Sequence, residues 1–137
     1  MARVFISPSK YVQGPGELAK LGSYVASYGK KALVVISAGG IRRSGDVVRK
    51  SFADANVAFD FDEFNGECSQ DEIDRLVGDA REKGADVVVG IGGGKIFDTA
   101  KAVANAVDAP VIVVPTIAAT DAPCSALSVV YTDRKSV

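Results

Sequence analysis

Uninterrupted apolar runs alternate along this chain with stretches in which apolar residues recur every three or four positions. The run at residues 32–36 (ALVVI) contains no polar side chain, which predicts a strand buried on both faces, as in a parallel sheet. Similar runs predict strands at residues 86–91 and 110–114. We expect two further strands, at residues 58–64 and 128–132.

Helical periodicity fills the spaces between these strands. Ser69 followed by Glu72 is a capping-box pattern, and apolar residues then recur at helical spacing up to Gly84. A second helix is expected at residues 45–55, with Ser44 as its N-cap. A third helix is expected at residues 96–106.

The beginning of the chain is less regular. Two short β-like pieces at residues 4–6 and 10–12 precede a Gly-Pro-Gly segment, which marks the start of a helix ending near Tyr28. Elsewhere the regular succession of strands and helices predicts an α/β fold, a doubly wound, Rossmann-like parallel sheet with helices on both faces. The 137 residues are the size of one domain, residues 1–137.

Composition and charge exclude several classes of function. Apolar residues make up 47% of the chain and charged residues 24%, which favours a folded domain over disorder. The formal net charge is −1 and Arg42 with Arg43 is only a local basic pair, so we expect no nucleic-acid partner. Without a signal peptide or an apolar run of membrane-spanning length, we expect a soluble cytoplasmic protein with no membrane partner.

Histidine is absent and the chain has 2 cysteines. Cys68 and Cys124 are far apart and form no CxxC motif, so two reduced thiols are expected rather than a disulfide or a metal knot. The absence of histidine removes the commonest general base and the commonest metal ligand. We therefore assign no catalytic residue and no metal ligand within this chain.

The most informative segment is a glycine-rich loop at residues 92–95 (GGGK), between a predicted strand and a predicted helix. Glycines let a backbone approach a diphosphate, the following helix presents free N–H groups, and Lys95 adds a positive charge. A P-loop would require glycine at Val89, and the GxGxxG fingerprint would require glycine at Lys95. The alternative is a tight turn that binds no ligand.

Two neighbouring features could extend this site. Asp98 lies one helical turn beyond Lys95, where it could brace the loop, approach a cofactor or simply favour the helix dipole. The segment 116–125 follows the strand at 110–114 and is rich in small and hydroxylated residues. It could line a polar pocket or be an ordinary surface loop.

These segments resemble a known family. GGGKIFDTAK at residues 92–101 and PTIAATDAPCSALSVVYTD at residues 115–133 are similar to the iron- and zinc-dependent alcohol dehydrogenases, in particular their glycerol dehydrogenase branch. The opening SPSKYVQGPGELAKLG and the segment GECSQDEIDRL at residues 66–76 also resemble the N-terminal region of that branch. The resemblance implies NAD-dependent oxidation of glycerol, or a similar small polyol, to dihydroxyacetone.

The resemblance also assigns roles to individual residues. It places the diphosphate of NAD on Gly93, Gly94 and Lys95, with Asp98 beside it. Asp121 would bind a substrate hydroxyl, for which a carboxylate is a suitable acceptor. The residues that would flank the adenosine or nicotinamide end of the cofactor are Thr116, Ala119, Ser125, Leu127 and Tyr131.

The chain departs from the family pattern in two places. An acidic residue usually binds the adenosine ribose at the position of Ser37. Because serine does not repel a 2′-phosphate, we expect weaker selectivity for NAD over NADP. The family's zinc or other divalent metal is held by an aspartate and two histidines of a helical C-terminal domain, which is absent from this chain, so the chain by itself is expected to be inactive.

Three interpretations remain open from the sequence. The first is the cofactor-binding part of a polyol dehydrogenase, forming a homo-oligomer as its relatives do. The second is a catalytically silent nucleotide-binding or interaction module. The third is a related dehydrogenase of a phosphorylated polyol, which would call for basic residues near Asp121, and the local sequence has none.

Overall fold

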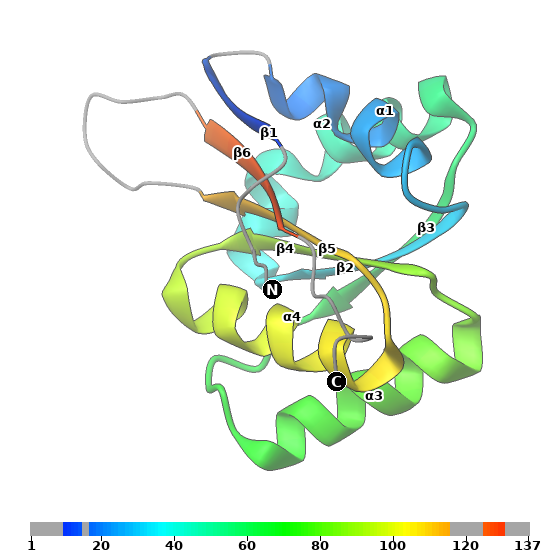
Figure 1. The fold of residues 1–137 in the computed structure, drawn as a ribbon. Coiled ribbons are helices and arrows are strands. Elements are labelled where there is room, and N and C mark those ends of the chain that lie inside the picture. The colour runs from blue at the N-terminus through cyan, green and yellow to red at the C-terminus, as the bar shows by residue number, and fades with distance from the viewer. Residues whose placement is uncertain (1–9, 15–16, 116–124, 131–137) are drawn as a thin grey trace.

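The computed structural model describes residues 10–14, 17–115 and 125–130, and it describes side chains over residues 18–115. These residues form a six-stranded sheet in the order β1-β6-β5-β4-β2-β3, with helices on both sides (Figure 1). The strands are β1 (Lys10–Gly14), β2 (Lys31–Ile36), β3 (Ala58–Glu63), β4 (Val87–Gly92), β5 (Val111–Pro115) and β6 (Ser125–Val130). The helices are η1 (Glu17–Lys20), α1 (Leu21–Ala26), α2 (Ala38–Ala55), α3 (Gln70–Lys83) and α4 (Gly94–Val107).

The α/β fold predicted from the sequence is confirmed. Strands β3, β2, β4 and β5 are parallel neighbours. The inner strands β2, β4 and β5 are almost continuously apolar, as burial on both faces requires, whereas β3 at the edge alternates apolar and acidic residues. Strands β6 and β1 extend this sheet with antiparallel pairs, so the sheet as a whole is mixed. The β-like piece expected at residues 4–6 lies outside the described residues.

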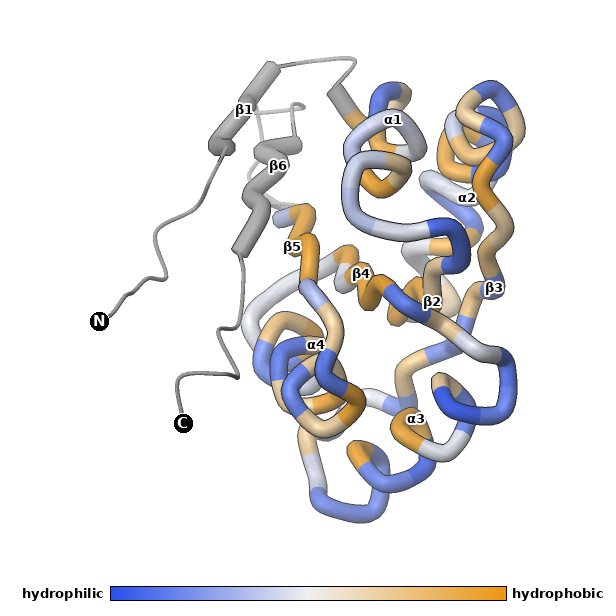
Figure 2. The backbone as a smooth tube through the Cα atoms, turned by 45° about the vertical axis from the view of Figure 1, so that its right-hand side comes forward, coloured by the Kyte–Doolittle hydropathy of each residue, from blue (hydrophilic) through white to orange (hydrophobic). Residues whose placement is uncertain are grey.

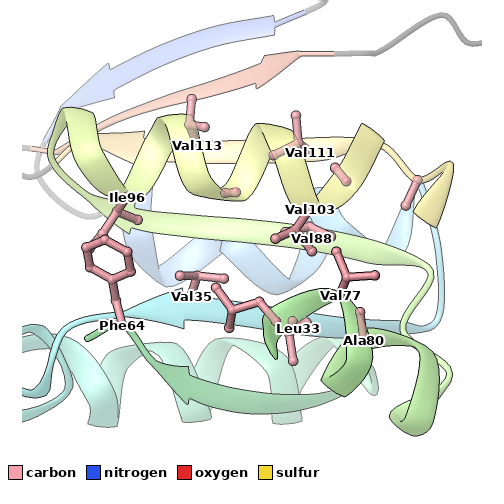
Figure 3. Close-up of a cluster of buried hydrophobic side chains, with 14 residues drawn as sticks. Leu33, Val35, Phe64, Val77, Ala80, Val88, Ile96, Val103, Val111 and Val113 are labelled. Atoms are coloured by element: carbon pink, nitrogen blue, oxygen red, sulfur yellow. The ribbon is translucent and has the colours of Figure 1, made fainter. Parts of the chain in front are cut away.

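Two apolar clusters hold the helices against the sheet. One face packs on α1 and α2 through residues such as Val34, Leu21 and Phe52. The other packs on α3 and α4 through Leu33 and Val103, among others (Figure 3). Both clusters draw on β2 and β4, which are mostly apolar in Figure 2, with Lys31 as the polar first residue of β2. Alternate residues of these strands point to opposite faces of the sheet. Because helices cover both faces, each strand has apolar side chains on both.

The predicted beginning of α2 is wrong. The sequence suggested residues 45–55 with Ser44 as N-cap, but the helix begins at Ala38 and Ser37 is its N-cap, with the Gly40 N–H donating to Ser37 Oγ at 3.0 Å. The two adjacent glycines masked the start, because glycine is a poor helix former. A Cβ at Gly40 would lie 2.8 Å from Cγ1 of Ile36, so glycine allows the helix to start immediately after β2.

Helix α1 approaches α2 very closely at Gly22. The Gly22 N–H donates to the Ser51 hydroxyl at 2.7 Å. A Cβ at Gly22 would lie only 2.2 Å from the backbone oxygen of Ser51. The absence of a side chain at this position therefore sets the distance between the two helices.

Helix α3 confirms half of its predicted capping box. Ser69 is the N-cap, and its hydroxyl accepts from the Glu72 N–H at 3.2 Å. The Glu72 carboxylate does not return to Ser69, because it accepts from the Asn65 N–H at 3.0 Å. Within the described ranges, none of the helices is both long and apolar enough to cross a membrane.

Candidate nucleotide-binding site

The candidate site lies at the carboxyl edge of β2 and β4. These strands are neighbours, and Ile36 pairs with Ile91 at their ends. From this edge α2 runs along one face of the sheet and α4 along the other, as Figure 1 shows. An open α/β sheet binds ligands in the crevice where consecutive connections diverge in this way. The structure thus brings Ser37 and the glycine loop, both predicted from the sequence, to the same edge.

The glycine loop exposes backbone that nothing in the described chain covers. Gly92 has a φ of 152°, which favours glycine. Gly93 is the N-cap of α4 and Gly94 is its first residue. A Cβ at Gly93 or Gly94 would meet no atom within 4 Å. Packing inside the described residues therefore gives no reason for glycine at these two positions, whereas close approach of a ligand to the backbone does.

The N-terminus of α4 is suited to an anion. No side chain caps it, and its first turn holds no acidic residue. Its first N–H groups therefore point outward without a side-chain acceptor, at the positive end of the helix dipole. Lys95 is exposed in this turn, and the Thr99 hydroxyl donates to its backbone oxygen at 2.8 Å. Asp98 is exposed nearby, and its role toward a cofactor stays a prediction.

Arg42 and Arg43, which form only a local basic pair in the sequence, lie at the start of α2. A Cβ on Gly39 would be 3.1 Å from Nη1 of Arg43 and 3.7 Å from Nη2 of Arg42. Both guanidinium groups therefore lie against the first turn of the helix that Ser37 caps. A pattern of glycines followed by adjacent basic residues could have signalled this arrangement, had the helix start been placed correctly.

A network centred on Arg75 fixes the loop between β3 and α3. Its Nε and Nη2 donate to the two carboxylate oxygens of Glu72 at 2.8 and 2.7 Å, and its Nη1 donates to Asp62 at 2.9 Å. Nη2 also donates to the backbone oxygen of Glu63 at 2.9 Å. No local sequence pattern predicts this network, because its members come from a strand, a loop and a helix.

The two buried carboxylates of this network have opposite pKa shifts. The hydrogen bonds from Arg75 lower the pKa of Glu72. Burial raises the pKa of Asp62 to about 6, and the neighbouring Asp79 carboxylate adds to this shift. One oxygen of Asp62, Oδ2, has no partner among the described residues. The charge of Glu72 is therefore well compensated by its hydrogen bonds, whereas the charge of the buried Asp62 is compensated only in part.

Most of the remaining predicted site residues lie outside the described part of the chain. These are Thr116, Ala119, Asp121 and Tyr131. Ser125 and Leu127 belong to β6, whose backbone pairs with β1 through Leu127 and Val12. Pro115 at the end of β5 pairs with Gly92, so β5 ends beside the glycine loop.

The described residues contain no group of three or more His, Cys, Asp or Glu side chains that could hold a metal ion. The donor set of a divalent metal site is therefore not found in this part of the chain. What the site offers is an anion-binding helix start, a glycine loop open to ligand and a lysine.

Residues 8–137 match the family described as iron-containing alcohol dehydrogenase. The chain belongs to this family. The match extends over nearly the whole sequence, including the glycine loop and the segments on either side of it.

Individual relatives agree with the family assignment. Glycerol dehydrogenase of Pseudomonas putida is 51% identical over 98% of this chain, and glycolaldehyde reductase of Halobacterium salinarum is 44% identical over 98%. The crystal structure of glycerol dehydrogenase from Schizosaccharomyces pombe aligns with a TM-score of 0.76 at 32% identity, over 88% of this chain and 31% of that one. This chain spans 37% of the length of each of the two curated relatives.

Proposed function

We propose that this chain binds NAD and supplies the cofactor-binding part of a polyol dehydrogenase. The observation that carries the proposal is the uncovered backbone of Gly93 and Gly94 at the start of α4. There the diphosphate would accept hydrogen bonds from the first N–H groups of the helix, with Lys95 adding a charge-assisted contact. Bound NAD would accept a hydride from the substrate carbon, and this chain's residues would hold and orient it.

The substrate we propose is glycerol or a similar small polyol, oxidised to a ketone such as dihydroxyacetone. The names of the relatives support a two- or three-carbon substrate. Asp121 would accept a hydrogen bond from a substrate hydroxyl, and Thr116, Ala119, Ser125, Leu127 and Tyr131 would line the rest of the cofactor site. Zinc or another divalent metal is expected in the family, but the described residues do not fit one, so we derive no step through it. A cytoplasmic location and a homo-oligomeric state stay predictions.

Substitution of Gly93 by valine tests the diphosphate site directly. The backbone at Gly93 is extended, with φ −110° and ψ −162°, so valine fits without backbone strain. Its side chain would enter the open space in which we place the phosphates. We expect the Kd for NAD, measured by calorimetry, to rise at least about tenfold, or about 1.4 kcal/mol. The free energy of unfolding should change by less than about 0.5 kcal/mol.

The matched control is Gly78→Ala, because Gly78 lies in the middle of α3 and its added Cβ would also meet nothing within 4 Å. This control should bind NAD as the wild type does. Wild-type affinity in Gly93→Val would show that the glycine loop is not the phosphate site. Turnover of glycerol by the chain would contradict the alternative of a catalytically silent nucleotide-binding module, whereas binding without turnover is expected of both.

Ser37 allows a test of cofactor selectivity in which the fold is preserved. Because aspartate caps helices as well as serine does, Ser37→Asp should keep α2 intact while adding the carboxylate that binds a ribose diol and repels a 2′-phosphate. Arg42 and Arg43 lie against Gly39 in the first turn of the same helix, and their charges would favour a phosphate near this turn. We expect the wild type to bind NAD and NADP with Kd values within about tenfold of each other, and the variant to favour NAD by at least about tenfold more.

Calorimetric titration of both proteins with both dinucleotides measures this ratio. Strong selectivity of the wild type for NAD would contradict the role given to Ser37. An unchanged ratio in Ser37→Asp would place the ribose elsewhere.

A further inference from the structure

The ammonium group of Lys95 has an anionic neighbour within the described part of the chain. Its Nζ lies 3.5 Å from Oε2 of Glu67, and the two side chains are 65% and 73% exposed. Lys95 belongs to the first turn of α4, whereas Glu67 belongs to the loop between β3 and α3. The ion pair therefore bridges two separate segments beside the proposed diphosphate site.

The position of Glu67 is set by a hydrogen-bonded turn. Its N–H donates to Oδ1 of Asn65 at 2.9 Å, and its backbone oxygen accepts from the Ser69 N–H at 3.0 Å. Gly66 supplies the left-handed conformation in between, with a φ of 107°. The Asn65 N–H is held in turn by the buried carboxylate of Glu72. The backbone thus keeps the Glu67 carboxylate at this edge, even though the side chain itself is exposed.

A carboxylate at this position has a definite electrostatic effect on the proposed ligand. A dinucleotide carries two negative charges on its diphosphate, and Lys95 is the cation of the glycine loop. Glu67 neutralises that cation when no ligand is present, and it repels the diphosphate when one arrives. We propose that Glu67 is a competing counter-ion for Lys95 that lowers the affinity for dinucleotide and favours its release. This inference rests on the proposed function, because it requires the diphosphate at the glycine loop.

The test is calorimetric titration of the purified protein with NAD for Glu67→Gln beside the wild type. Glutamine keeps the size of the side chain and removes its charge. Exposed ion pairs of this kind contribute modestly, so we expect the Kd for NAD to fall about two- to fivefold. The higher affinity should appear mainly as slower dissociation of NAD, measured by stopped-flow displacement. Changes at one binding interface mostly alter the dissociation rate.

Two comparisons separate the local effect from a change in net charge. Glu82→Gln makes the same charge change at an exposed position of α3 and should leave the Kd unchanged. In a Lys95→Gln background, where the competition is gone, the gain from Glu67→Gln should fall to half or less. Weaker binding in Glu67→Gln would overturn the proposal and indicate a direct contact of the carboxylate with the ligand.

Failure of this inference and failure of the proposed function give different results. A wild type that binds NAD, together with a Glu67→Gln variant of equal affinity, overturns the counter-ion role alone. A wild type that does not bind NAD overturns the proposed function and this inference with it.

Discussion

Replacement of Gly22 by alanine should lower the free energy of unfolding by about 2–4 kcal/mol. The added Cβ would lie 2.2 Å from the backbone oxygen of Ser51. Neither backbone can rotate away as a side chain would, so α1 and α2 must separate. The hydrogen bond from Gly22 N–H to the Ser51 hydroxyl, now 2.7 Å, would be lost in the same movement. Urea unfolding at neutral pH, followed by far-ultraviolet circular dichroism, measures the change.

Gly78→Ala is the matched control for this prediction. Gly78 also lies within a helix, but its Cβ would meet no atom within 4 Å. There the better helix propensity of alanine should raise the free energy of unfolding by about 0.5–1 kcal/mol. If both alanine variants were stabilised, the close approach of α1 to α2 would not hold in solution.

Substitution of Glu72 by glutamine is the second change with a large expected effect. Its carboxylate accepts two hydrogen bonds from Arg75 and one from the Asn65 N–H, and Glu72 is 2% exposed. Removal of one charge from a buried, hydrogen-bonded pair is costly, although Arg75 is 43% exposed and keeps its contact with Asp62. We therefore expect a loss of about 2–3 kcal/mol at pH 7.

The dependence on pH distinguishes this effect from a simple packing defect. Because the pKa of Glu72 is lowered in the folded protein, its stabilisation is complete above its unfolded pKa, 4.5, and is lost as pH falls through the lower folded value. The stability difference between wild type and Glu72→Gln should narrow in that acid range. Asp62 has the opposite effect on the pH dependence of stability in both proteins. Because its pKa is raised to about 6 in the folded state, the folded state binds a proton at higher pH than the unfolded state does, and this favours folding as the pH falls.

Urea unfolding at pH 7 and at successive lower pH values provides the measurement. Glu82→Gln, on the exposed side of the same helix, should change stability by less than about 0.5 kcal/mol. If the difference in unfolding free energy between wild type and Glu72→Gln stayed constant through the acid range, the charge on Glu72 would not be what stabilises the loop.

The sequence predicted the parts of the fold that depend on short-range patterns. The apolar runs of β2, β4 and β5 and the N-cap of α3 are examples, because burial on both faces and capping each leave a local signature. The start of α2 was misplaced because Gly39 and Gly40 mimic a loop. The close contact of Gly40 with Ile36, which explains one of these glycines, is visible only once β2 and α2 are packed. The antiparallel strand β1 was identified, but its pairing with β6 depends on contacts across most of the chain.

The candidate site was predictable to a similar extent. The glycine loop has its own sequence pattern, so its place between a strand and a helix could be predicted. The Glu67–Lys95 pair could not, since it joins the loop between β3 and α3 to the start of α4. The network around Arg75 could not either, since it joins β3 to α3 and to the loop between them. Sequence spacing predicts that Lys95 and Asp98 lie on one helix. It does not predict that the carboxylate of Glu67, in a distant loop, lies beside that helix.

The open space around Gly93 and Gly94 has a consequence for how variants of this protein would behave in cells. Because side chains there disturb nothing within the described structure, such variants should accumulate to normal abundance while losing cofactor binding. Variants of Gly22 should be degraded before binding matters. In a mutational scan that measures both protein abundance and cofactor-dependent activity, residues 93 and 94 should show the largest difference between the two measurements. Positions with such a difference would identify the residues of the proposed site.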